Sequence, residues 1–287
     1  SVPKNRRYDP LPAPPWETAL AALEWGKVVA RLSGHASSEP GRALCGSLSP
    51  GVDLDAIRAS LEENRDGRRM LLQDGALPLA GVTEIRQEVE KAVKGASLSP
   101  QELLRIGQTA RSGEKTRKFF EERRGKYPRL ARHAREIPPL RDIAEEIELR
   151  IDSAGHVPDR ASPALGNLRR QLAQVRSRLQ ETAERILSSP RYSRHVQEAY
   201  ATVRSGRVVI PFKTGSKGLF QGIVHDTSQS GQTVFFEPEE LVYLNNEVRM
   251  GELEVEREVA RILAELSGKV ARQERELLLA LSLLARI

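Results

Sequence analysis

Two widely separated heptad patterns of apolar residues constrain the fold of this chain more than any other feature of its sequence. In the first pattern, steps of three and four residues separate Leu165, Leu168, Leu172, Val175 and Leu179, and Ile186 lies one heptad further on. The second pattern, interrupted only at Gly251, contains Leu241, Leu244, Val248, Val255, Val259, Ile262 and Leu266. Such narrow apolar stripes on otherwise charged helices are typical of coiled coils. We therefore expect the two helices to bury their stripes by pairing antiparallel.

The sequence between the two patterns, residues 201–238, has a different character. β-Branched and aromatic residues alternate there with Gly, Ser and Asp, which is typical of strands and tight turns. Four strands are predicted, with the sequences ATVR, RVVIPFK, LFQGIVH and QTVFF. Ser205 and Gly206 suit a two-residue hairpin turn, and Pro211 predicts an edge strand or a bulge within the second strand. We expect a small antiparallel sheet at the tip of the helix pair.

The rest of the chain predicts helices with short polar breaks. Apolar residues follow a helical period over 16–36, 53–73 and 97–124, and Asp53 and Ser99 are suitable caps for the last two. The predicted fold class is mainly α: a helical core, a long antiparallel coiled-coil pair and a small antiparallel β insert. The predicted segments are a flexible N-terminal lead at 1–16, a helical core at 17–160, an outgoing helix at 161–200, a β-containing tip at 201–238 and a returning helix, cut short, at 239–287.

Composition narrows the class of function. Aromatic residues make up 5% and charged residues 29%, a balance that suits long amphipathic helices better than an enzyme barrel. The formal net charge of +6 favours a polyanionic partner such as nucleic acid. Cys45 is the single cysteine, so no disulfide within the chain is possible and a reducing, cytoplasmic compartment is expected. No apolar run is long enough to span a membrane.

The basic residues are clustered rather than evenly spread. Residues 105–135 contain eleven Lys or Arg and three acids, as do residues 160–213, whereas 237–258 is strongly acidic. Two interpretations stay open: solvated helix faces with salt bridges between the helices, or contact with phosphates. For phosphate contact the sequence favours the cations that flank the β insert, namely Arg191, Arg194, Arg204, Arg207, Lys213 and Lys217. The phenylalanines Phe212, Phe220, Phe235 and Phe236 are expected to form the core of the small sheet rather than a platform for bases.

No catalytic, cofactor or metal site is predicted in this chain. His225 and Asp226 are adjacent and would point to opposite faces of a strand, so we expect a structural role for His225 and turns at Asp226 and Ser228. Glu237 is expected to end a strand. The segment GQTARSGEKT at 107–116 resembles a phosphate-binding loop, but its spacing is wrong and it lies in a predicted helix.

Several segments carry a family likeness. The sequences SGRVVIPFK, GLFQGIVHDTSQSGQTVFFEPEELVYLNNEVR and ELEVEREVARILAELS, together with ALEWGKVVARLSGHASSEPGRALCGSLSP upstream, resemble the bacterial branch of MutS paralogues whose full-length members end in a Smr domain. The likeness covers about 17–287. It implies that the chain holds the helical core, the lever helices and the clamp at their tips, but lacks the ATPase and Smr nuclease-like domains.

The resemblance also implies a function. Family members restrain recombination by acting on branched DNA or rescue stalled and collided ribosomes, and they dimerise through an ATPase that uses ATP and Mg. By this likeness the chain is a non-enzymatic, nucleic-acid-engaging or ribosome-engaging part of a homodimeric protein. The alternative is a structural and oligomerisation scaffold whose coiled-coil arms bind protein partners.

Overall fold

The computed structural model of the chain describes residues 16–216 and 218–287. The fold is mainly α, with one four-stranded antiparallel sheet, as the sequence predicts. The predicted N-terminal lead, apart from Trp16, lies outside the described residues. The described residues form two compact units: the part up to Pro158 with Leu263–Ile287, and Asp159–Ile262. Across the described ranges, no helix combines the length and the apolar character needed to cross a membrane.

The first unit is built from helices. They are α1 (Trp16–Ala22), α2 (Trp25–Ser33), α3 (Glu39–Gly46), α4 (Leu54–Gln73), α5 (Arg86–Val93), α6 (Pro100–Glu121), α7 (Pro128–Glu136), α8 (Arg141–Arg150), the last turns of α11 (Glu239–Arg272), and α12 (Glu274–Arg286). The single helix expected over 16–36 is two helices, because Glu24 adopts a left-handed φ of 52° between them. Asp53 and Ser99 cap α4 and α6 as expected.

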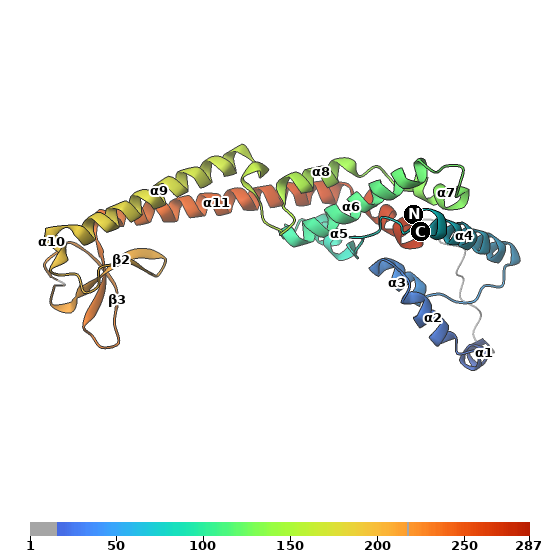
Figure 1. The fold of residues 1–287 in the computed structure, drawn as a ribbon, viewed down its shortest axis with the longest axis horizontal. Helices are drawn as coiled ribbons and strands as arrows, with labels where there is room; N and C mark the ends of the chain where they lie inside the picture. Colours follow the sequence, from blue (N-terminus) through green and yellow to red (C-terminus); the bar gives the residue numbers. More distant parts are fainter. Residues whose placement is uncertain (1–15, 217) are drawn as a thin grey trace. The chain divides into compact units, whose positions relative to one another are not determined.

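The second unit contains a pair of long helices that run side by side (Figure 1). A short 3-10 turn, η1 (Asp159–Ala161), precedes α9 (Pro163–Ser188), which is followed by α10 (Pro190–Ser193), the sheet and α11. Ser162 at the start of α9 donates to Glu258, while Tyr192 in α10 donates to Glu240 in the first turn of α11. The helices α9 and α11 are therefore antiparallel.

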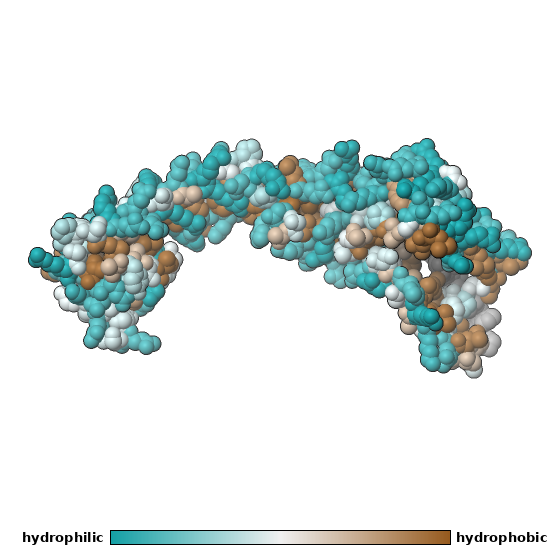
Figure 2. Space-filling model, in the orientation of Figure 1, coloured by the Kyte–Doolittle hydropathy of each residue, from teal (hydrophilic) through white to brown (hydrophobic). Residues whose placement is uncertain are grey.

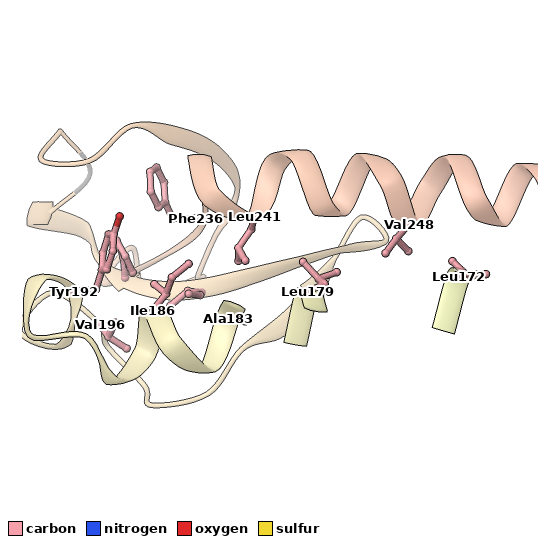
Figure 3. Packing of buried hydrophobic residues seen from close by; sticks show 11 residues of the cluster. Leu172, Leu179, Ala183, Ile186, Tyr192, Val196, Phe236, Leu241 and Val248 are labelled. Carbon is pink, nitrogen blue, oxygen red and sulfur yellow. The ribbon is translucent and has the colours of Figure 1, made fainter. Parts of the chain in front are cut away.

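The two heptad stripes pack together as predicted between Leu172 and Ile186 on α9 and between Leu241 and Val255 on α11. Leu266, the last member of the predicted second stripe, belongs to the first unit instead. Leu172 and Leu179 of α9 point towards Val248 of α11 (Figure 3). A side chain at Gly251 would crowd Leu172, since an added Cβ would lie 3.2 Å from Leu172 Cδ1. Gly251 thus interrupts the heptad pattern at a position where Leu172 of the partner helix occupies the space of the missing side chain. In the space-filling view the apolar residues form a line between the two helices, with hydrophilic residues on either side (Figure 2).

The sheet lies at the end of the helix pair where α9 ends and α11 begins (Figure 1). Its strands are β1 (Thr202–Arg204), β2 (Arg207–Lys213), β3 (Gly222–Thr227) and β4 (Thr233–Pro238), in the order β1-β2-β4-β3 with antiparallel neighbours. The predicted turn closes the first hairpin, where Ser205 and Gly206 have φ values of 52° and 75°. A bulge in β3 separates Val224 from Asp226.

Two expectations about this sheet are wrong. Pro211 lies in β2, an interior strand, not in an edge strand or at a bulge. The strand accepts it because β1 pairs only with residues 207–209, and at Pro211 that side of β2 meets the segment after α10 instead. Asp226 lies within β3 rather than in a turn, whereas Ser228 does form the turn, donating its N–H to Thr233 O at 2.9 Å.

Candidate nucleic-acid interface

Three of the predicted cations gather at one end of β2. Arg191 is exposed in α10, and its guanidinium lies 5.3 Å from the centre of the Tyr192 ring and 5.9 Å from that of Phe220. Arg194 is exposed just after α10. Lys213 ends β2, and its Nζ donates to the carbonyl of Arg194 at 3.1 Å. Within the described residues, no carboxylate forms an ion pair with any of these three cations.

Arg204 lies at the other end of β2, in the β1–β2 hairpin. Its guanidinium stacks on Phe235 at 4.1 Å from the ring centre, and its Nε is 3.7 Å from a carboxylate oxygen of Asp226. Phe235 pairs with Pro211 of β2, so the Arg204 guanidinium reaches from the hairpin back over the sheet.

Arg207 faces the interior of the unit rather than the solvent. Its Nε and Nη2 donate to the carboxylate of Glu237 at 2.8–3.0 Å, and Nη2 also donates to Asn246 at 2.8 Å. The Arg207 side chain is 22% exposed and that of Glu237 is fully buried. The Nε and Nη2 donors of Arg207 are thus used within the protein. Lys217, the sixth predicted cation, lies outside the described residues.

The buried Glu237 carboxylate collects three donors. Besides Arg207, His225 Nε2 lies 2.5 Å from one oxygen and Asn245 Nδ2 donates to the other at 2.7 Å. Burial by itself raises the pKa of Glu237, but the hydrogen bonds from these three side chains outweigh it and hold that pKa below its ordinary value. The carboxylate is therefore ionised at neutral pH and balances the charge of the buried guanidinium.

The aromatic side chains mostly serve the core, as expected. Phe212 and Phe236 are buried and stacked, with ring centres 5.2 Å apart, and Phe220 packs edge-on against Phe212. Tyr192 joins this group, and burial followed by its hydrogen bond to Glu240 raises the pKa of its phenol to about 12. Phe235 differs, because it is half-buried beneath Arg204.

Most other arginines have carboxylate partners. In the first basic cluster, Arg123 pairs with Asp74 at 3.2 Å, and further pairs join Arg105 to Glu88, Arg111 to Glu148, Arg124 to Glu121 and Arg129 to Glu62. Between the long helices, Arg176 pairs with Glu252 at 2.8 Å and Arg178 with Glu247 at 2.9 Å. Ion pairs on the protein itself therefore account for these residues, which is the first of the two interpretations that the sequence left open.

The segment that resembles a phosphate loop has a packing role. It lies inside α6, and an added Cβ at Gly107 would be 2.9 Å from Ile147 Cγ2, so this glycine permits close contact between α6 and α8. We assign no ATP contact to it. Within residues 16–216 and 218–287, no group of three or more His, Cys, Asp or Glu side chains is placed to hold a metal ion.

The chain is similar to curated proteins over most of its length. The chain is 39% identical over 253 residues to Endonuclease MutS2 of Pelotomaculum thermopropionicum, covering 88% of this chain and 32% of the relative. It is 38% identical over 269 residues to the protein of that name in Geobacillus thermodenitrificans, with 93% of this chain and 34% of the relative covered. It is 35% identical over 275 residues to the Endonuclease MutS2 of Halalkalibacterium halodurans, with 94% of this chain and 35% of the relative covered.

The chain belongs to the MutS2 family. It spans about a third of the length of these MutS2 relatives. No protein-family model matches it. The segments that carry the family likeness contain Arg207, His225, Glu237 and Asn245, which are also the residues of the buried polar network.

Sequence reasoning missed this network, although one signal was present. Asn245 follows Leu241 by four residues and precedes Val248 by three, so it falls on the buried stripe of α11. A polar side chain at such a position requires hydrogen-bond partners inside the protein. Glu237, between Phe236 and Pro238, gives a similar signal at the end of a strand.

Proposed function

We propose that this chain engages nucleic acid through the sugar–phosphate backbone, at the end of the sheet where Arg191, Arg194 and Lys213 gather. One observation carries this proposal. These three cations are exposed, have no carboxylate partner among the described residues and lie together at one end of the sheet, whereas the unpaired arginines Arg160, Arg170 and Arg257 lie on the helices and not at the sheet. Unpaired cations at a small rigid sheet provide sites for phosphate oxygens.

The arrangement suits backbone contact rather than the recognition of bases. Arg191 is held over two aromatic rings, which restricts the guanidinium before any ligand binds. Arg204, at the other end of β2, offers a second contact. Contacts to phosphates position a protein on a nucleic acid without specifying its sequence.

The target we propose is branched DNA or structured ribosomal RNA, bound in the cytoplasm. The relatives are named endonucleases, so we propose that the whole protein is an enzyme of nucleic acid, acting as a homodimer with ATP and Mg, and suppressing recombination or rescuing ribosomes. This chain would supply binding, because the described residues of its candidate surface are exposed cations beside aromatic rings.

A mobility-shift titration with branched DNA, linear duplex and folded ribosomal RNA at several salt concentrations tests the proposal. The triple variant Arg191→Glu, Arg194→Glu, Lys213→Glu is expected to bind more weakly. For duplex arms, the slope of log affinity against log salt concentration should become shallower by about 0.9 for each phosphate that the variant no longer neutralises.

The matched control reverses three exposed arginines of the same unit that lie away from the sheet, Arg160, Arg170 and Arg257, each to Glu. Its formal charge change is the same, so a general decrease of positive charge would affect both triple variants equally. A salt slope that is the same in the unsubstituted chain and in the sheet variant would reject the assignment.

A scaffold for protein partners is the second candidate. Tyr243 and Met250, one heptad apart on α11, are 67% and 54% exposed, beside a groove of about 430 Å³ that Val175 and Gly251 help to line. Sedimentation equilibrium tests this candidate by comparing the chain with its Tyr243→Ala, Met250→Ala variant. Self-association that depends on these residues, with no salt-dependent binding of nucleic acid, would replace the first proposal.

A further inference from the structure

We propose that the sheet and the first turns of α11 form one rigid body, and that α9 is the helix that shifts against it. The two long helices make different kinds of contact with the sheet. Directional polar bonds join the sheet to α11, and non-directional apolar contacts join it to α9.

The first polar tie is the side chain of Asn245, which is buried on α11. Its Oδ1 accepts from Val208 N at 2.9 Å, and its Nδ2 donates to Val208 O at 3.0 Å. Val208 and Val203 of β1 face each other as a non-hydrogen-bonded pair of the antiparallel ladder. The backbone N–H and C=O of Val208 therefore point away from β1. A side-chain amide presents the same donor and acceptor as a peptide group. Asn245 thus continues the hydrogen-bond ladder from β2 onto α11.

The second tie is the buried charge pair. Arg207 of β2 donates to both oxygens of Glu237 on β4, and to Val242 O and Asn246 Oδ1 on α11. His225 of β3 contacts the same carboxylate. Three strands and the first turns of the helix therefore share one network. Charge-assisted hydrogen bonds of this kind are both strong and directional, so a rotation of the sheet on α11 breaks several of them at once.

The contact with α9 is of another kind. Ala183 and Ile186 pack against the apolar face of the sheet, and no hydrogen bond or ion pair joins residues 163–188 to the described residues of 202–238. A groove of about 700 Å³ lies between α9 and the β1–β2 hairpin, lined in part by Leu187 and Val203. Apolar contacts beside an open groove permit sliding while the hydrogen bonds of the sheet stay intact. The ion pairs that such a shift would break, Arg176–Glu252 and Arg178–Glu247 between α9 and α11, join partly exposed side chains.

The boundary between the two bodies falls at Ser189 and Pro190, where α9 ends. After α10 the chain stays with the sheet, since Gln197 N donates to Pro211 O at 2.7 Å and Lys213 N to His195 O at 2.9 Å. A displacement of α9 along α11 would therefore leave the sheet, and the cations at its end, fixed on α11. The proposal does not depend on what those cations bind.

Pulsed electron paramagnetic resonance tests this arrangement without any nucleic acid. Spin labels are attached to cysteines in a Cys45→Ser background of the 287-residue chain. One pair joins the sheet to α11, with Thr227→Cys and Arg249→Cys, and the other joins the sheet to α9, with Thr227→Cys and Gln174→Cys. The sheet–α11 pair is expected to give the narrower distance distribution.

The variant Asn245→Ala is expected to broaden the sheet–α11 distribution to the width of the sheet–α9 one. Asn167→Ala, the same change at an exposed position of α9, should leave both widths unchanged. Equal widths for the two pairs before any change at Asn245 would overturn the proposal, whether or not Asn245→Ala folds. An unchanged width in a folded Asn245→Ala chain, shown by an unaltered circular dichroism spectrum, would also overturn it.

Discussion

Arg207 and Arg194 belong to the same small module, yet their surroundings give them opposite roles. Arg207 meets a fully buried carboxylate and two further acceptors within the protein, so its charge is used to hold the sheet together. Arg194 is exposed, and no side-chain partner is found for it in the described part of the chain. The number of basic residues near the β insert therefore does not measure how many phosphates it can bind. Whether each arginine can bind a phosphate depends on whether an acidic side chain of the protein already pairs with it.

Removal of the buried acid should produce the largest effect. Glu237→Ala leaves the Arg207 guanidinium, 22% exposed, without its counter-charge, and leaves donors on His225 and Asn245 unsatisfied. Removing one partner of a buried ion pair costs about 3–5 kcal/mol. The free energy of unfolding, measured by urea denaturation followed by circular dichroism, should fall by that amount.

Glu254→Ala is the matched control, because Glu254 is an exposed glutamate on α11 of the same unit. Its effect on the free energy of unfolding should stay within about 0.5 kcal/mol. If the two variants were equally stable, the network around Glu237 would not hold the sheet in place, and the contrast between Arg207 and Arg194 would have no basis.

A carboxylate of intermediate exposure tests the same contrast through pH. Hydrogen bonds from Arg261 and Ser162 lower the pKa of Glu258 from 4.5 to about 2. Because the folded-state pKa lies below the unfolded value, the contribution of Glu258 to stability is present above pH 4.5 and is lost as the pH falls towards about 2.

Urea denaturation at a series of pH values from about 5 to about 2.5 measures this contribution. The unsubstituted chain should lose stability more steeply over that interval than Glu258→Gln, which has no carboxyl group to titrate at this position. Parallel curves for the two proteins would show that the bonds from Arg261 and Ser162 do not favour the ionised form in the folded state.

Much of the fold was predictable because periodicity reports burial directly. The heptads of α9 and α11 repeat at the spacing of a helix face, and the four strands alternate at the spacing of a sheet face. Gly251 breaks the heptad, but the break concerns one position, where Leu172 fills the space. The turn at Ser205 and Gly206 was predictable for a local reason, since glycine tolerates a positive φ.

The candidate site was harder to predict because it depends on contacts between residues that are far apart in the sequence. Whether an arginine is free depends on which acid reaches it, and Glu237 lies thirty residues beyond Arg207. Pro211 misled for a similar reason: its tolerance in an interior strand depends on where β1 ends, which is a property of pairing rather than of the strand itself. The break at Glu24 could not be predicted, because a helical pattern of apolar residues contains no signal for a single residue with a left-handed φ.

An ion pair on the helix surface should have a much smaller effect than the buried pair. Arg178 and Glu247 join α9 to α11 at 2.9 Å, but their side chains are 57% and 29% exposed. Solvent screening reduces such pairs to about 0.2–1 kcal/mol. A double-mutant cycle with Arg178→Ala and Glu247→Ala should give a coupling free energy in that range, and it should shrink when salt is added.

The smallest effect on stability is expected at Arg194, where the contrast with Arg207 is sharpest. Arg194→Ala removes an exposed guanidinium and leaves its backbone carbonyl free to accept from Lys213 as before. The free energy of unfolding should therefore change by less than about 0.5 kcal/mol, while the affinity for a nucleic-acid duplex falls. For Arg207→Ala we expect the opposite: a large decrease in the free energy of unfolding and a smaller change in the affinity of the folded protein for the duplex. A variant at Arg194 that destabilised the fold as much as one at Arg207 would mean that the exposed cations are structural as well, and would remove the reason for assigning them to phosphate.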